Sequence, residues 1–359
     1  MRKTADLFQT TTRVHNEREK VDQRIMAGEK GEGALVTAVV FAQLAIILCY
    51  RVILKAGTCA WQSALPALAA APALILPGRA AAKRGVKPFL LLPLLPALLA
   101  DMLLALTALL DLSATFLLPG EGRFALALAV CVFGLAAQLS SGMPALARLA
   151  RMLAVPFILT LLFSILTSLS VARLGNLTPI LGKGILPTLS ASLFMIGCVW
   201  SAPLPILLDR ENGGKKAPRA LRYSMLAVGL CILTALAVAL LWPMEALIQP
   251  LSPAKRMMLL NETSASTLVW SLLVFAWILL LMLAIGASAQ AFQDIALDVA
   301  PVKKRGWVFL ALPYALVLWP AAAGNEKMTE WLVALSPWRA ALMALSIVLC
   351  LVFGGRKKA

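Results

Sequence analysis

One acidic residue lies near the middle of an apolar stretch and could do chemistry there. It is Asp101, within LLPLLPALLADMLLALTALL. A charged side chain at the centre of a membrane helix costs about 3 kcal/mol on insertion scales, and such residues are functional by default. Asp101 could receive the amine of a ligand or carry a proton. The alternative is structural, with a neutral carboxyl bonded to a polar neighbour such as Gln43, and the sequence leaves both interpretations open.

A second candidate is an interrupted apolar run, GILPTLSASLFMIGCVWSAPLPILLDR, at residues 184–210. Gly197, Pro203 and Pro205 disturb the helix that this run would otherwise form. Non-helical backbone inside a membrane is tolerated where it is buried in protein or lines a cavity. Amides freed at such a break can bind the carboxylate of an amino acid, and freed carbonyls its amine. A proline kink without any ligand is an equally open alternative.

These features predict one small-ligand cavity near the middle of the membrane. Its predicted ligand-binding residues are Gln43, Asp101, Gly197, Cys198, Trp200 and Ser201. Trp200 could cap a side-chain pocket or could simply pack among apolar neighbours. A leucine in place of Gly197 should fill the space where backbone meets ligand, and so abolish the response without preventing membrane insertion.

The sequence predicts no catalytic constellation, metal site or cofactor. The single histidine, His15, lies in the polar first 32 residues, away from the apolar stretches. The six cysteines lie in or beside apolar stretches and include no CxxC pair. The usual ligand spacings of zinc sites and redox motifs are therefore lacking, and we do not expect an enzyme.

The elements that would hold these residues are membrane-spanning helices. Of 359 residues, 61% are hydrophobic and 14% charged, and the mean hydropathy is +0.87. Stretches of about 20 apolar residues can cross a bilayer. Ten such stretches occur, at 33–50, 58–77, 88–110, 124–140, 152–170, 185–208, 223–242, 266–289, 306–321 and 334–354. Because Lys and Arg fall in the short gaps between them, the net charge of +16 indicates membrane topology and not nucleic-acid binding.

The distribution of charge predicts an orientation. Most of the 33 Lys and Arg residues fall on the side that also carries both termini, which the positive-inside rule makes cytoplasmic. We therefore expect a polar cytoplasmic tail at 1–32 and an all-α transmembrane domain at 33–355. Ten helices can form two inverted five-helix repeats, 33–170 and 185–354, with a site where the first helix of each repeat is interrupted.

Several short motifs follow one another in an order that matches a known family. They are AGTCAWQSALPALAAA (56–71), TFLLP (115–119), GMPALARLARMLAVP (142–156), NLTPILGKGILPTLSASLF (176–194) and KKAPRALRYSM (215–225). Together they resemble the spore germination permeases, the membrane B subunits of nutrient germinant receptors, within the amino acid–polyamine–organocation transporter superfamily. The resemblance implies a permease fold, and it makes Arg148 a candidate gate or interface residue, with snorkelling to lipid headgroups as the alternative.

The chain departs from the family pattern at three places. AQLAIILCYRVILKAG (42–57) lacks the Gly-x-Gly interruption of the first helix, so we expect that helix to be less broken. Pro144 replaces an acidic residue, and GCVWSAPLP lacks the glutamate that follows the glycine of the sixth helix. The resemblance therefore implies a ligand site that is altered or lost.

Three functions remain open on the sequence. The first is a nutrient-sensing subunit that binds a small neutral nutrient, with an amino acid expected, and signals to receptor A and C subunits. The second is a secondary transporter that couples an amino acid to protons or sodium, and the third is a ligand-free membrane scaffold. The missing glycine pair and acids favour the sensor over a sodium-coupled transporter. All three place the chain in a bacterial cell membrane or spore inner membrane, in contact with lipid.

Overall fold

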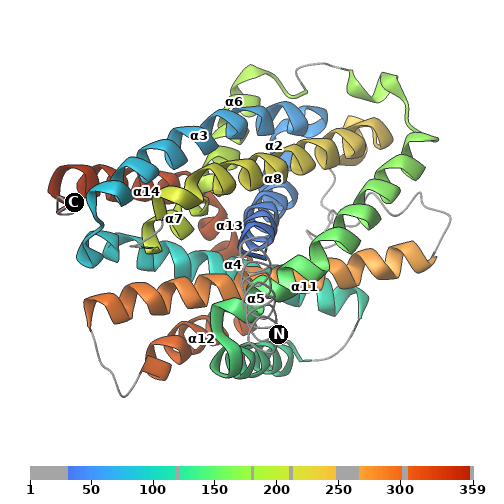
Figure 1. Cartoon of the computed structure of the whole chain (residues 1–359). Helices are drawn as coiled ribbons and strands as arrows, with labels where there is room; N and C mark the ends of the chain where they lie inside the picture. The colour runs from blue at the N-terminus through green and yellow to red at the C-terminus, as the bar shows by residue number, and fades with distance from the viewer. Residues whose placement is uncertain are drawn as a thin grey trace, which may run out of the picture.

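The computed structural model describes residues 31–117, 122–178, 182–209, 213–247, 267–300 and 306–355. Nearly all of these residues are helical, and none of them is in a strand (Figure 1). The tail predicted for residues 1–32 lies outside the described residues except for its last two positions.

The helices follow one another with short connections. A helix over residues 31–47 comes first, followed by η1 (Leu48–Val52), α2 (Ile53–Ala56), η2 (Gly57–Cys59), α3 (Ala60–Arg84), η3 (Pro88–Leu94), α4 (Leu95–Phe116) and α5 (Arg123–Leu169). The chain continues with η4 (Leu174–Leu177), α6 (Ile185–Cys198), η5 (Val199–Ser201), α7 (Leu204–Leu208), α8 (Gly213–Leu241), α9 (Met244–Leu247), α11 (Thr267–Val299), α12 (Gly306–Ala323), α13 (Glu326–Ala334) and α14 (Ser336–Phe353).

Length and composition identify membrane spans within the described residues. Seven helical segments are long and apolar enough to cross a bilayer, and two shorter apolar helices cover 123–136 and 307–323. The first of the seven, Gly31–Arg84, holds two of the stretches predicted from hydropathy. The all-α membrane class is thereby confirmed, whereas a total of ten crossings stays a prediction.

Two glycines turn the chain where the sequence predicts separate helices. Gly57 and Gly142 both have φ of 59°, a left-handed conformation that is strained for residues with a Cβ. Gly57 lies between α2 and α3. Gly142 divides α5 into two segments, and these correspond to the predicted stretches 124–140 and 152–170.

The first helix runs through the middle of the bundle. It lies between α3, α6, α8 and α14 on one side and α4, α5, α11 and α12 on the other (Figure 1). In its most apolar window 94% of the residues are buried, against 28% for Pro144–Thr167. A helix that is apolar on every face fits such a position, and it brings Gln43 into contact with Asp101 of α4 and Ser201 of η5.

Helices at corresponding positions of the two predicted repeats pack against each other. The second, third and fourth helices form the pairs α3 with α8, α4 with α11, and α5 with α12. The α5 and α12 helices run antiparallel, because Phe124 stacks edge-on against Trp319 while Cys131 contacts the carbonyl of Tyr314. Opposed directions are what inverted repeats require, so the packing supports the repeat layout, which stays a prediction.

Segments predicted for the same side of the membrane lie at the same end of the bundle. At the predicted inner end, Gly31 lies against Ala147 and Gly85 against Gly354. At the other end, Gly182 lies against the carbonyl of Ala56. Contacts between segments distant in sequence therefore agree with the grouping that the charges predict.

The orientation itself can be measured by labelling single introduced cysteines. Lys215 and Lys183 are both exposed and lie on opposite predicted sides. We expect Lys215→Cys to react with a membrane-impermeant maleimide only after the cells are opened, and Lys183→Cys to react in intact cells. The unsubstituted chain is the control, because all six of its thiols are buried. Labelling of residue 215 from outside would overturn the topology.

Candidate functional site

Prolines cause the interruption after α6. Pro203 has no N–H to donate to the carbonyl of Val199. That carbonyl accepts instead from the N–H of Ala202, at 3.1 Å, which tightens the chain into the 3-10 turn η5. The backbone thus bends before α7 begins, and the bend lies next to the first helix at Gln43.

The first helix stays helical where it passes the bend after α6. Its irregularity is the π-helical turn η1 at Leu48–Val52, whose flanking residues keep right-handed φ and ψ. The absence of the Gly-x-Gly pair predicts such a less broken helix. The two helices that meet at the candidate site are therefore a continuous one and a bent one.

A buried carboxylate joins the helices around this point. Asp101 of α4 is 4% exposed and accepts three hydrogen bonds. The Nε2 of Gln43 donates to Oδ2 at 2.5 Å, and the indole Nε1 of Trp200 donates to the same oxygen at 2.7 Å. The guanidinium of Arg339 on α14 pairs with Oδ1. One side chain therefore links α4, the first helix, η5 and α14.

Arg339 is the part of this network that the sequence analysis missed. It is 4% exposed, and its Nη2 also donates to the carbonyl of Leu332 at 2.7 Å. A signal was available, because Arg339 lies inside the predicted crossing 334–354, where a lone cation requires a partner. With Arg339 beside it, Asp101 is an ion-pair partner and not the neutral carboxyl that the structural alternative assumed, whereas Gln43, the predicted polar neighbour, does donate to it.

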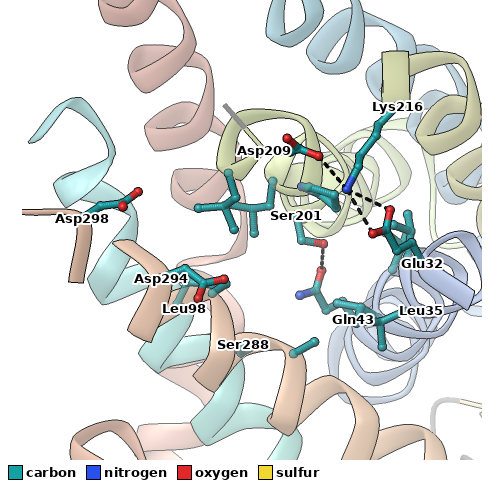
Figure 2. A pocket seen from close by; sticks show the side chains of 18 residues that line it. Glu32, Leu35, Gln43, Leu98, Ser201, Asp209, Lys216, Ser288, Asp294 and Asp298 are labelled. Atoms are coloured by element: carbon teal, nitrogen blue, oxygen red, sulfur yellow. Dashed lines mark hydrogen bonds and ion pairs between the residues drawn. The ribbon is translucent and has the colours of Figure 1, made fainter. Parts of the chain in front are cut away.

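A cavity of about 500 Å³ opens beside the network (Figure 2). Its polar floor includes Gln43 and Ser201, and the hydroxyl of Ser201 donates to Oε1 of Gln43 at 2.8 Å. The walls are mostly apolar, and their apolar side chains are Leu35, Val36, Val39, Val40, Leu98, Leu204, Pro205, Leu208, Ala287 and Ala291. The size and the mixed lining are typical of small-molecule sites.

Charged residues surround the predicted inner end of the cavity. Lys216 lies between Glu32 and Asp209, with its Nζ 2.9 Å and 2.8 Å from their carboxylate oxygens. Asp294 and Asp298 of α11 lie across the cavity from this group (Figure 2). These lining charges were not predicted from the sequence, because they lie at the ends of the apolar stretches, where charges ordinarily meet water.

Four of the six predicted ligand-binding residues do not line the cavity. Asp101 lies behind Gln43, to which it is bonded. Trp200 is fully buried, and the thiol of Cys198 donates to the carbonyl of Phe194 at 3.2 Å. A Cβ added to Gly197 would lie 2.4 Å from the backbone of Ser336. Gly197 therefore allows α6 to pack against α14, which corrects the expectation that leucine there would simply fill a ligand space.

Arg148 lies away from this cavity. Its side chain is exposed, and its Nε donates to the carbonyl of Pro144 at 3.3 Å. Its role as a gate or interface residue stays a prediction.

The buried ion pair can be tested by removing one charge. We expect Arg339→Leu to lower the free energy of unfolding by about 3–5 kcal/mol, because Asp101 is left buried without its counter-charge. Replacing both residues, as Asp101→Leu with Arg339→Leu, should recover part of that loss. Tryptophan fluorescence during denaturation in detergent measures both, and an Arg339→Leu protein as stable as the parent would contradict the pairing.

The close approach at Gly197 has a matched control on another helix. Gly197→Ala should destabilise the protein by about 1–3 kcal/mol, since the new methyl group meets backbone atoms. A Cβ at Gly229 in α8 would meet nothing within 4 Å, so Gly229→Ala should be neutral or stabilising by up to about 1 kcal/mol. The same unfolding measurement compares the two, and equal effects would show that α6 and α14 do not touch at Gly197.

Comparison with known proteins assigns the chain to a family. No curated protein matches the chain significantly. A family described as spore germination protein, the spore permeases, matches residues 98–321. The match includes Asp101, the bend after α6 and most of α12, and it covers more than half of the chain. The chain is therefore a member of the spore germination permease family.

Proposed function

We propose that this protein is the nutrient-sensing, permease-like subunit of a spore germinant receptor. The observation that carries the proposal is the cavity beside the bend after α6, with Gln43 and Ser201 in its floor. In permeases built from inverted repeats, substrates bind where discontinuous helices meet near the midplane. A small nutrient, such as an amino acid, is the proposed ligand, and the receptor A and C subunits are the proposed partners.

The position of the first helix supports a sensing role. It touches the cavity through Leu35, Val36, Val39, Val40 and Gln43, and it lies between the two groups of helices (Figure 1). A ligand that changes how this helix packs would alter contacts on both sides. A shift in conformation requires that the ligand bind one arrangement better than the other, and a cavity between helices from both groups provides such a difference.

The cavity can be filled without touching the ion pair. Ser201→Leu places a larger apolar side chain at the cavity floor and removes the donor to Gln43. We expect spores that carry this variant to lose the germination response to their nutrient, or to need at least about tenfold more of it. The readout is the fall in optical density of a spore suspension over a range of nutrient concentrations.

Ser170→Leu is the matched control, because that serine is exposed at the end of α5 and does not line the cavity. Spores with this variant should respond as the parent does. Immunoblotting of spore membranes compares protein levels. A Ser201→Leu protein present at the parental level with a parental dose response would show that the cavity is not the nutrient site.

A further inference from the structure

Among the described residues that line the cavity, acidic side chains outnumber basic ones. Its described lining holds four carboxylates, from Glu32, Asp209, Asp294 and Asp298, and one ammonium, from Lys216. Lys216 is already paired with Glu32 and Asp209. Neither an Arg nor a second Lys lines the cavity within the described part of the chain, so a negatively charged ligand would find no cation to hold it.

Asp294 is the carboxylate best placed to meet a ligand. It is partly buried on the cavity face of α11, and its one hydrogen bond among the described residues comes from Nε2 of Gln290 at 3.1 Å. A carboxylate has about four acceptor positions. Asp294 therefore keeps acceptor capacity on the side of the cavity, and Asp298 one turn further along adds to the negative field.

A second, independent observation points to a ligand deeper in the same cavity. Ser288 lines it and is only 6% exposed, yet its hydroxyl has no hydrogen-bond partner among the described residues. The hydroxyl of a serine in a helix commonly donates a hydrogen bond to the carbonyl four residues earlier. The oxygen of Ser288 is not one of the fully enclosed side-chain atoms without a partner, so it is accessible from the cavity, where a ligand can hydrogen-bond to it.

The spacing of these residues defines the shape of the ligand. Ser288, Ala291 and Asp294 follow one another at every third position along α11, and all three line the cavity. Six residues of helix separate the hydroxyl from the carboxylate by about 9 Å along the axis. Apolar side chains of the first helix and α7, among them Val36 and Leu204, line the cavity with them.

We propose that the cavity binds a small organic cation, with a protonated amino group at Asp294, an apolar stem, and a hydrogen-bonding group at Ser288. This inference rests on the proposed function, because it names the ligand class of the same cavity, and it replaces the amino acid proposed there by an amine without a carboxylate. The ammonium would donate to a carboxylate in a partly dehydrated site, where charge-assisted hydrogen bonds are strong.

Calorimetric titration of the full chain in lipid nanodiscs tests the proposal with one probe and its relatives. The probe is 5-amino-1-pentanol, which has an ammonium and a hydroxyl at the ends of an apolar chain. Its relatives are 1,5-pentanediol, which lacks the charge, 5-hydroxypentanoate, which reverses it, and pentylamine, which lacks the hydroxyl. We expect the diol and the carboxylate to bind at least about tenfold more weakly than the probe. Equal affinity for the probe and the diol would overturn the proposal without any substitution.

Two variants assign the ends of the ligand. Asp294→Asn should weaken binding of the amino alcohol at least about tenfold. Ser288→Ala should weaken it several-fold and leave pentylamine unaffected, because pentylamine has no group for that hydroxyl. Glu330→Gln removes an exposed acid of α13 that does not line the cavity and should change nothing. Parental affinity for the probe in a folded Asp294→Asn protein would overturn the assignment.

Other outcomes separate this inference from the proposed function. One such outcome is that sodium or potassium chloride gives titration heat that Asp294→Asn abolishes, while the amines give none. Asp294 would then be an inorganic-cation site, and the inference would be overturned. Spores that respond through Ser201 to an uncharged nutrient, while the protein binds no amine, would keep the proposed function and overturn the ligand class. If the protein binds amines but spores that lack it germinate as the parent does, the ligand class is kept and the proposed function is overturned.

Discussion

The ion pair between Asp101 and Arg339 is the constraint on which the rest of the site depends. Each side chain lies in an apolar crossing and is 4% exposed. The carboxylate and the guanidinium must therefore meet each other, because no water or headgroup is available to either. The pair fixes α4 and α14 in rotation and depth. Gln43 and Trp200 then complete the carboxylate's hydrogen bonds, so the first helix and η5 are placed by the same requirement.

This network also explains why the cavity has a rigid floor. The amide of Gln43 donates to Asp101 through its nitrogen and accepts from Ser201 through its oxygen. Both ends of the amide are thus committed, and the side chain cannot rotate without breaking two hydrogen bonds. Asp101 does not touch the cavity, yet it orients the residue that does. A polar group held in one orientation binds a ligand without a further loss of conformational entropy.

The sequence predicts the elements well and the pairings only in part. Hydropathy and charge locate the apolar stretches and group their ends. Both can be read from the order of residue types along the chain, without knowing how the helices pack. The polar partner of Asp101 was predicted as Gln43, since few polar residues occur inside the crossings. Hydropathy does not specify how each helix is rotated about its axis. For that reason Gly197 was predicted to face a ligand, whereas it faces Ser336, and Arg339 was not matched to Asp101.

The first helix is held at two levels by contacts of different strength. At one level Gln43 belongs to the buried network, where its hydrogen bonds are shielded from water. At the other, Glu32 pairs with Lys216, whose side chain is 26% exposed and which also holds Asp209. Ion pairs exposed to water contribute little and are screened by salt, so this second tie is the easier one to break. The cavity lies between the two levels. The first helix is therefore held more firmly at the Gln43 end, where the buried charges keep the helices together, than at the Lys216 end.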